Sequence, residues 1–296
     1  MMTNCLLIIN PSSGKGNGRA LEKRIVDTLS HSFNEISVVY TNRRGDGERL
    51  VLEASTNLDV VFCVGGDGTV KEVVNGIMKT NQVIKLGILP NGTVNDAARS
   101  LGIPVKTEEA LLALRDLELT SMDIGQVNHN YFISLIAIGG IPEAIHNVSV
   151  EAKSKYGILA YFFNGAFYAS RQKPFHLRLK TAMEEDSVET SLFVLSLHPT
   201  VASMPKFFQR ARYNDGLLHT LLFPSFQFFG AAFYVWRILR GRINQTKRLT
   251  YGSYQQLIID CNNANLTINI DGDKEGAFPL DVTILPSAIS VYIPKK

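Results

Sequence analysis

The chain has 296 residues, of which 45% are hydrophobic and 19% are charged, so it can bury sizeable cores and is not of the disordered class. Its net charge of +3 is too small for a protein that binds nucleic acid mainly through its charge, so we expect no nucleic-acid partner. A chain of this length predicts two domains.

The cysteines and the N-terminal residues indicate the compartment. Cys5, Cys63 and Cys261 stand far apart, and two of them lie in apolar runs typical of strands, which indicates buried thiols in a reducing environment. No signal peptide is evident, and no apolar stretch reaches the ~18 residues of a spanning helix. We therefore expect a cytoplasmic protein.

Strands and helices alternate over the first 115 residues. The expected strands are residues 5–9, 36–40, 58–64 and 85–89, and the expected helices are residues 20–29, 47–55 and 70–78. This alternation predicts an α/β domain with parallel strands joined by right-handed crossovers. The loops at the carboxyl ends of such strands line one edge of the sheet.

The stretch Val64-Gly-Gly-Asp-Gly-Thr69 is the strongest candidate site. It follows a run typical of a buried strand and precedes a helical pattern, and three glycines let its backbone approach a ligand closely. The N–H groups of such a turn suit a phosphate, and Asp67 beside them suits Mg²⁺ or its waters. The alternative is an ordinary strand-to-helix turn, in which Gly and Asp are common.

A second glycine-rich turn, residues 10–18, comes earlier in the chain. Its glycine spacing fits neither a Walker A loop nor a dinucleotide-binding fingerprint, so it is a weak signal by itself. However, four glycine- or hydroxyl-bearing turns would open onto the same edge of the sheet: residues 10–18, 41–47, 65–69 and 90–96. Their convergence predicts a phosphate-binding edge.

From Met122 onward the pattern changes to short apolar and alternating runs, which predict an antiparallel β domain. These runs are residues 123–128, 131–138, 176–181, 188–197, 217–223, 255–260, 265–270, 280–284 and 289–293. We place the boundary near Ser121, which predicts domains of residues 1–121 and 122–296.

Two apolar segments, residues 157–168 and 226–239, interrupt the β pattern and have basic residues at their flanks. Segments of this length are usually core helices, but their aromatic and basic residues also suit the surface of an anionic membrane. Two further stretches, Asp215-Gly216 and Asp271-Gly-Asp273, place acids in turns that would also pass for plain hairpins.

Taken together, the chain resembles the diacylglycerol kinase catalytic family, the bacterial soluble lipid kinases that are related to sphingosine and ceramide kinases. The resemblance rests on Asn10-Pro-Ser-Ser-Gly-Lys15, Thr41, Gly65-Gly-Asp-Gly-Thr69, Leu89-Pro-Asn-Gly-Thr-Val-Asn-Asp96, Asn214-Asp-Gly-Leu217 and Asp271-Gly-Asp273. It implies a Rossmann-like N-terminal domain that binds ATP and a C-terminal β-sandwich domain that takes the lipid. The implied reaction is ATP-dependent phosphorylation of a lipid hydroxyl, with diacylglycerol as the leading acceptor.

The same resemblance implies roles for individual residues. Asp273 would accept the proton of the lipid hydroxyl, Asp271 would orient Asp273 or help to place a metal, and Asp67 would lie close to Mg²⁺. A second, structural Mg²⁺ would be held by Asp96, Arg212, Asp215 and Leu217. The implied ATP-binding residues are Asn10, Pro11, Ser12, Ser13, Gly14, Thr41, Gly65, Gly66, Asp67, Gly68, Thr69, Glu72, Gly92 and Thr93. The resemblance also implies that the protein contacts a membrane surface peripherally. A homodimer is left as an open alternative.

Two departures from the family pattern keep alternatives open. The family usually has Asp-Gly-Glu where Asp273 ends the motif here, and residues 197–212 lack the Asn-Gly…Gly-Gly pattern. Glu275 is a rival for the general base. An NAD kinase is the second hypothesis, although the Thr-Gly-Ser-Thr-Ala-Tyr-like segment it would need is missing from the sequence. A catalytically weak or silent nucleotide- or lipid-binding module is the third.

Overall fold

The computed structural model describes residues 4–14, 16, 18–139, 173–205, 207–225, 230, 233–234, 236–237, 240–243, 246–263 and 266–295. The chain divides into two compact units. The first comprises Met1–Ile124 and Pro286–Lys296, and the second comprises Gly125–Leu285.

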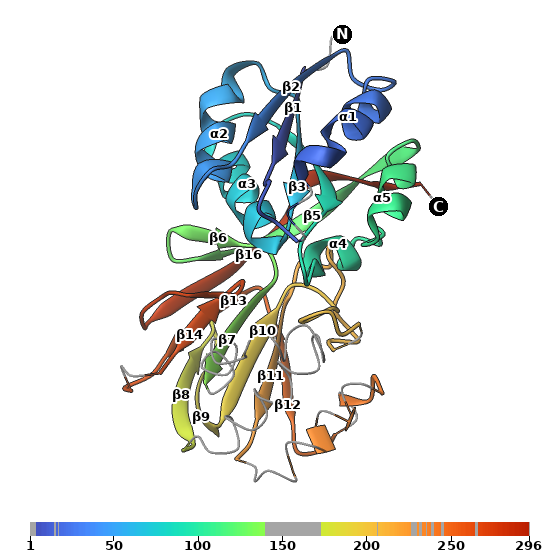
Figure 1. The fold of residues 1–296 in the computed structure, drawn as a ribbon. Coiled ribbons are helices and arrows are strands. Elements are labelled where there is room, and N and C mark those ends of the chain that lie inside the picture. The colour runs from blue at the N-terminus through green and yellow to red at the C-terminus, as the bar shows by residue number, and fades with distance from the viewer. Residues whose placement is uncertain are drawn as a thin grey trace. The chain divides into compact units, whose positions relative to one another are not determined.

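The first unit is built on parallel strands in the order β2-β1-β3-β4, and the end of a long later strand, β16, joins them beside β4 (Figure 1). Their bounds are β1 Asn4–Ile9, β2 Glu35–Tyr40, β3 Val60–Gly65, β4 Lys85–Pro90 and β16 Leu280–Pro294. Every residue of β3 is buried, as expected for a parallel strand that is covered on both faces.

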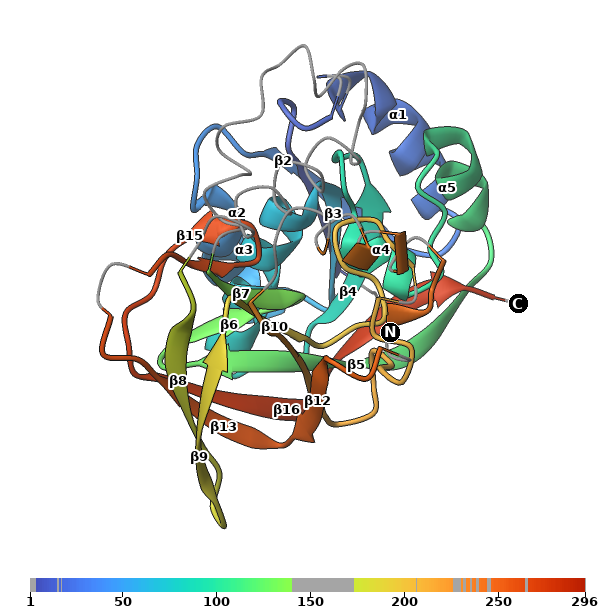
Figure 2. The same cartoon turned by 90° about the horizontal axis from the view of Figure 1, so that it is seen from below.

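Helices cover both faces of these strands (Figures 1 and 2). On one face lie α1 and α5, and on the other lie α2 and α3. The bounds are α1 Gly18–Leu29, α2 Asp46–Ala54, η1 Ser55–Asn57, α3 Asp67–Lys79, α4 Asp96–Ser100 and α5 Thr107–Ala113. The helices α2 and α3 pack closely because Gly76 lies against Val51, where an added Cβ would be 2.7 Å from the valine Cβ.

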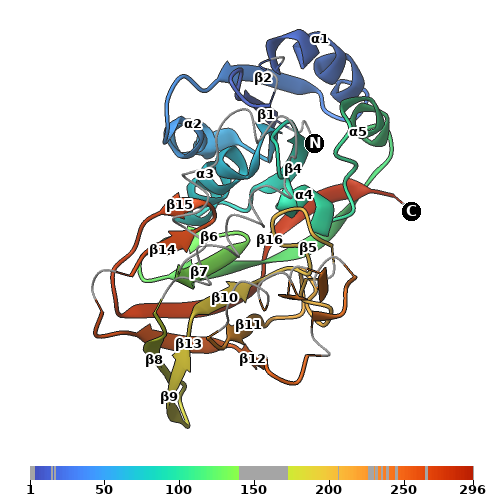
Figure 3. The ribbon, with the colours of Figure 1, turned by 60° about the horizontal axis from the view of Figure 1, so that its bottom comes forward.

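The second unit contains two antiparallel sheets. One has the order β12-β11-β10-β7-β14-β15, and in it β14 and β15 follow β7 (Figure 3). The bounds are β7 Leu135–Gly139, β10 Leu192–Ser196, β11 Leu218–Phe223, β12 Thr250–Tyr254, β14 Ile268–Ile270 and β15 Asp273–Lys274. The other sheet joins the first part of β16 to β13, β8 and β9, and the hairpin of β5 and β6 also pairs with β16. The bounds are β5 Leu117–Val127, β6 Asn130–Phe132, β8 Phe175–Lys180, β9 Glu185–Thr190 and β13 Gln256–Asp260.

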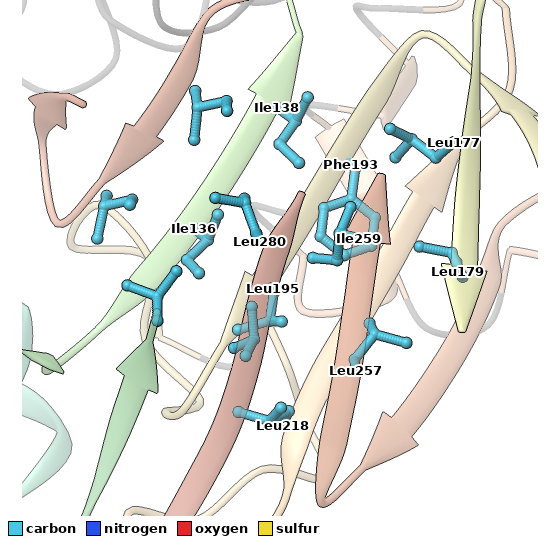
Figure 4. Packing of buried hydrophobic residues seen from close by; sticks show 14 of the residues in the cluster. Ile136, Ile138, Leu177, Leu179, Phe193, Leu195, Leu218, Leu257, Ile259 and Leu280 are labelled. Atoms are coloured by element: carbon cyan, nitrogen blue, oxygen red, sulfur yellow. The ribbon is translucent and has the colours of Figure 1, made fainter. Parts of the chain in front are cut away.

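Side chains from both sheets form one core between them, so the second unit is a β-sandwich (Figure 4). Ile136, Phe193 and Leu218 come from one sheet, and Leu177 and Ile259 come from the other. Strand β8 alternates strictly between buried and exposed residues, which is the pattern of a strand with one face in the core.

The predicted fold class, a parallel α/β domain followed by an antiparallel β-sandwich, is confirmed. The predicted division of the chain differs from the structure at two places. Residues 286–296 belong to the first unit, because β16 continues past the sandwich and Val291 and Tyr292 pair with β4. The first unit also extends to Ile124, because β5 runs without a break across the expected boundary at Ser121.

Several expected strands also have different limits. The runs 280–284 and 289–293 are parts of the single strand β16, whereas the runs 131–138 and 188–197 are each divided into two strands. Strand β12 was not expected.

The apolar segment 157–168 lies outside the described residues, and the segment 226–239 is described only in part. Within the described part of the chain, no helix is long and apolar enough to cross a bilayer.

Candidate active site

Three loops that follow neighbouring parallel strands are tied together in the first unit. The Asn10 side chain donates a hydrogen bond from Nδ2 to Thr69 Oγ1 at 2.9 Å, which joins the loop after β1 to the start of α3. The Asn91 side chain donates from Nδ2 to Ser13 Oγ at 3.1 Å, which joins the loop after β4 to the loop after β1. The predicted residues Asn10, Ser13 and Thr69 are therefore brought together.

Three glycines in these loops, Gly14, Gly66 and Gly92, lie where the loops pack against one another. An added Cβ on Gly92 would lie 2.4 Å from Gly66 Cα, so these two backbones touch. Gly14 has a φ of +58°, and its Cβ would lie 2.4 Å from the carbonyl oxygen of Asn91. The three glycines of residues 65–68 were predicted to let a ligand approach closely. One of them, Gly66, serves the close approach of the protein to itself.

Gly68 is different. No heavy atom lies within 4 Å of the position of an added Cβ, leaving aside its chain neighbours and the backbone of its own helix, and its φ is not in the left-handed region. Nothing in the described contacts of Gly68 therefore requires a glycine there. The residue lies in the first turn of α3, whose N-terminus has no side-chain cap. The first N–H groups of a helix favour an anion, so the open space at Gly68 fits the phosphates of a nucleotide.

Asp67 joins the start of α3 to the start of α4. Its carboxylate accepts a hydrogen bond from the N–H of Ala97 at 3.2 Å. Burial raises the pKa of Asp67, although the N–H groups of Ala97, Asn95 and Asp96 act in the opposite direction. The Asp67 side chain is only partly exposed. Two hydrogen bonds hold the loop that supplies these N–H groups: Asn95 Oδ1 accepts the N–H of Gly92, and Nδ2 donates to the Gly92 carbonyl, both at 2.9 Å.

Glu72, a predicted nucleotide-binding residue, has a structural role in the loop before α2. Its two carboxylate oxygens accept the N–H groups of Gly45 and Gly47 at 2.8 and 2.9 Å. Thr41 lies at the start of this loop and is buried, and its N–H donates to the carbonyl of Ile9 at 3.0 Å. The structure therefore shows that both residues help to fix this loop in place. Their contact with ATP stays a prediction.

In the second unit, Asp271 anchors the turn between β14 and β15. It has a φ of 53°, and its carboxylate accepts the N–H groups of Ile133, Ser134 and Leu135 at 2.7, 2.8 and 3.0 Å. Both oxygens are thus engaged with the backbone at the start of β7. This arrangement suits a residue that orients the turn carrying Asp273, and it leaves little capacity for a metal ligand.

Asp273 and Glu275, the two candidate bases, follow this turn. Asp273 begins β15 and lies opposite Ile270 of β14, and the N–H of Glu275 donates to the carbonyl of Ile268 at 3.2 Å. Both residues are partly exposed. Because alternate residues of an extended chain lie on the same side, the two carboxylates remain rivals for one role.

Asp215 lies at the end of a hydrogen-bonded chain of three side chains. Its carboxylate is 3.0 Å from Nε2 of His219, and Nδ1 of His219 contacts the Tyr251 hydroxyl. The same carboxylate accepts the N–H groups of Arg212 and Leu217 at 2.8 and 3.1 Å. A neutral His219 that donates from Nε2 to Asp215 would accept from Tyr251 at Nδ1. Burial raises the pKa of Asp215, but the hydrogen bonds from His219 and the backbone outweigh burial and lower it.

The predicted metal residues Arg212, Asp215 and Leu217 are therefore close together, but Asp215 is surrounded by hydrogen-bond donors. Asp96 belongs to the other unit. Among the described residues, no three His, Cys, Asp or Glu form a metal-binding group. An ion at Asp215 would have to rely on carbonyl oxygens and waters as well, so the second Mg²⁺ site stays a prediction.

Comparison with known proteins identifies the family. The family model of the diacylglycerol kinase catalytic domain matches residues 4–127. A diacylglycerol kinase of Staphylococcus haemolyticus is 30% identical over 299 residues, which cover 99% of this chain and 89% of that protein. A diacylglycerol kinase of Staphylococcus aureus strain bovine RF122 is also 30% identical, with 99% of this chain and 93% of that protein covered. The chain belongs to the diacylglycerol kinase family.

The protein is therefore a lipid kinase, an enzyme family that uses ATP. Its fold is that of a crystal structure of a diacylglycerol kinase from Bacillus anthracis str. Sterne, with a TM-score of 0.83 at 23% identity and coverage of 99% and 97% of the two chains. The matched residues 4–127 contain the three loops joined by Asn10 and Asn91. These loops are thus part of the catalytic domain that defines this kinase family.

The sequence analysis missed several residues that build this site. Asn91 and Asn95 were noted only as parts of a motif, and their hydrogen bonds hold the loops of the kinase in place. His219 and Tyr251 were not predicted, because a histidine in an apolar strand and a tyrosine in a polar strand carry no recognisable spacing. Asn95 precedes α4 and has a left-handed backbone conformation, with a φ of 56°. The sequence carried a signal for this conformation, because asparagine adopts it more readily than most other residues do.

Proposed function

We propose that this lipid kinase transfers the γ-phosphate of ATP to the hydroxyl of diacylglycerol and so forms phosphatidic acid. The observation that carries the proposal is the open space at Gly68, in front of the uncapped N-terminus of α3. The names of the Staphylococcus relatives support diacylglycerol as the acceptor.

The residues of the first unit would hold the nucleotide. The N–H groups at the start of α3 would bind its phosphates, and Thr69 and Asn10 would keep the two neighbouring loops in register. Mg²⁺, when bound, would neutralise charge on the β- and γ-phosphates, and Asp67 is the carboxylate that would face it.

The acids of the second unit would serve the acceptor. The lipid hydroxyl oxygen attacks the γ-phosphorus, the bond from that phosphorus to the bridging oxygen breaks, and ADP leaves. Asp273 accepts the hydroxyl proton, and Asp271 keeps the turn in place through its three backbone hydrogen bonds. A structural Mg²⁺ at Asp215, Arg212, Leu217 and Asp96 is a secondary proposal, and a chelator that left thermal unfolding unchanged would contradict it.

Labelled ATP tests the proposal when it is offered with diacylglycerol, ceramide, sphingosine or NAD in parallel. We expect labelled phosphatidic acid on a thin-layer plate and no labelled NADP. A different labelled lipid would correct the substrate. If ATP binds and no acceptor is labelled, the chain is a silent binding module.

The identity of the base is tested by Asp273→Ala and Glu275→Ala. Removal of a general base costs ~10²–10⁴-fold in rate. We expect this loss for Asp273→Ala and a small effect for Glu275→Ala. The reverse result would assign the role to Glu275. In Asp273→Glu, which restores the usual family residue, a gain in rate would show that the shorter acid limits the native enzyme.

A further inference from the structure

The chain between β11 and β12 is attached to the outer face of the sandwich by buried residues. Tyr234 is 7% exposed and packs edge-on against Phe223 of β11, with ring centroids 5.5 Å apart. Ile243 is fully buried in the same hydrophobic cluster, which also contains Leu221. These contacts orient the described residues around position 236, which are drawn in orange in Figure 1.

The same segment turns two aromatic side chains to the solvent. Phe233 is 47% exposed and Trp236 is 45% exposed, and their ring centroids are 6.3 Å apart. The other large hydrophobic residues exposed in the described chain are aliphatic and lie on separate elements; they are Leu52, Val83, Leu112, Leu119 and Met183. An adjacent pair of exposed aromatic rings is therefore unusual for this surface.

Arginines accompany both rings. The guanidinium carbon of Arg237 is 5.9 Å from the ring centroid of Phe233, and that of Arg240 is 5.2 Å from the ring of Trp236. We name Phe233, Trp236, Arg237 and Arg240 the aromatic–arginine patch. Three further basic residues follow, Arg242, Lys247 and Arg248, and the sequence contains no Asp or Glu between residues 216 and 259.

We propose that the aromatic–arginine patch docks this lipid kinase on the surface of an anionic bilayer. Aromatic rings enter the interfacial layer of a membrane, while arginines beside them bind anionic headgroups. A symmetric contact with a second copy of the chain would place like-charged arginines opposite each other, so the charge favours a membrane over a dimer. The inference rests on the proposed function, because it gives the site access to a substrate that resides in lipid.

Trp236 is the only tryptophan in the chain, so intrinsic fluorescence reports directly on the patch. The experiment adds vesicles of phosphatidylcholine alone, or of phosphatidylcholine with phosphatidylglycerol, to the full-length protein. We expect a blue shift of the emission with the anionic vesicles only, and the shift should weaken as salt rises. Sedimentation with vesicles without a blue shift would place the contact elsewhere, and no binding at low salt would overturn the proposal.

Charge reversal supplies the matched comparison. Arg240→Glu should weaken the partition onto anionic vesicles roughly tenfold or more, since each basic residue near the surface contributes about a fivefold factor and the reversal changes the charge by two units. Lys23→Glu, which makes the same change of charge on α1, should leave the partition unchanged, and equal losses in the two variants would show that only the net charge matters. Phe233→Ser and its control Leu112→Ser test the apolar part in the same way.

A dissolved short-chain diacylglycerol separates this inference from the proposed function. If the native kinase phosphorylates the dissolved lipid but shows no blue shift on vesicles, membrane docking by the patch is refuted and the proposed function is retained. If it binds anionic vesicles through Trp236 but phosphorylates neither form of the lipid, the proposed function is refuted and membrane docking is retained. A change from dimer to monomer in Phe233→Ser would instead assign the patch to a contact between two copies.

Discussion

Gly68 and Gly76 lie in one helix, α3, and illustrate two different uses of glycine. Gly76 is required because Val51 and the Glu48 carbonyl leave no room for a side chain, with 2.7 and 2.9 Å to an added Cβ. Gly68 faces open space. At the residue scale, this contrast separates a glycine that packing requires from one that the protein's own contacts do not require.

We predict that Gly68→Ala raises stability and weakens the binding of ATP. Alanine favours a helix over glycine by up to ~1 kcal/mol, and the new methyl group would occupy the proposed phosphate space. Gly76→Ala is the matched control and should lower stability. Thermal unfolding and the titration of ATP measure both effects. A Gly68→Ala variant with unchanged ATP affinity would remove the main support for the phosphate site.

We expect Asp67 to lower the free energy of unfolding at neutral pH and to be needed for phosphoryl transfer. Its folded pKa is raised by burial, so the folded state binds this proton more strongly than the unfolded state does. The contribution of Asp67 to stability is therefore lowest above the raised pKa and improves as the pH falls toward the ordinary value of 3.8. We expect Asp67→Asn to be at least as stable as the native protein at pH 7 and to lose phosphoryl transfer.

Urea unfolding at several pH values checks this expectation. The difference in stability between Asp67→Asn and the native chain should shrink as the pH falls through the raised pKa of Asp67, because the native carboxylate takes up its proton there. Full activity in Asp67→Asn would contradict the proposed role beside Mg²⁺.

At the scale of elements, Asp271 joins the turn between β14 and β15 to the start of β7. Asp271→Ala would leave the N–H groups of Ile133, Ser134 and Leu135 without this acceptor. Buried donors that lose their partner cost ~1–3 kcal/mol, so we expect a loss of about 3 kcal/mol in the free energy of unfolding. Asp271→Asn keeps one acceptor oxygen and should lose less.

Lys274→Ala, on the exposed neighbouring residue of β15, is the control and should unfold like the native chain. If Asp271→Ala were as stable as this control, the carboxylate would have no anchoring role. In that case a direct function of Asp271 in catalysis would become the better explanation.

The elements differ in how well the sequence predicted them. The buried run before Gly65 predicted β3 because a parallel strand is apolar throughout, and the following spacing predicted α3. Strand β12 was missed because Thr250–Tyr254 is an edge strand with no fully buried residue, so it lacks an apolar pattern. The sequence did not predict that Gly66 packs against Gly92, because this contact joins segments far apart in the chain.

The site could be predicted as a set of motifs but not as a network of hydrogen bonds. The acids at 67, 215 and 271 were selected by their motifs. Their partners are mostly backbone N–H groups of distant residues, such as Ile133 for Asp271, and no side-chain pattern records them. The sequence therefore predicted the carboxylates but not the N–H groups that surround them, and the roles of these carboxylates at a metal stay predictions.

At the scale of the whole molecule, the lowered pKa of His198 makes the free energy of unfolding depend on pH. It is 1% exposed, and burial lowers its pKa from 6.5 to about 4, although the backbone of Ile133 and Leu197 acts in the opposite direction. Between these two pH values the unfolded chain binds a proton that the folded chain does not, so stability falls as the pH falls. The loss should be on the order of 3 kcal/mol.

Unfolding in urea at pH 7 and pH 5, followed by the fluorescence of Trp236, measures this effect. His198→Gln should flatten the dependence on pH, and His129→Gln, on an exposed histidine, should leave it as in the native chain. Equal slopes in all three proteins would show that other groups control acid unfolding.

The path of the chain has a consequence for its synthesis. Residues 125–285 are an insertion in the first unit, which is completed only by residues 286–296. Tyr292 stacks on Phe62 with ring centroids 5.8 Å apart, and β16 covers the edge of β4. During translation, therefore, the edge of β4 stays unpaired until residues 125–285 have been synthesised and β16 follows. A nascent chain that stalls within residues 125–285 exposes this edge to chaperones and proteases.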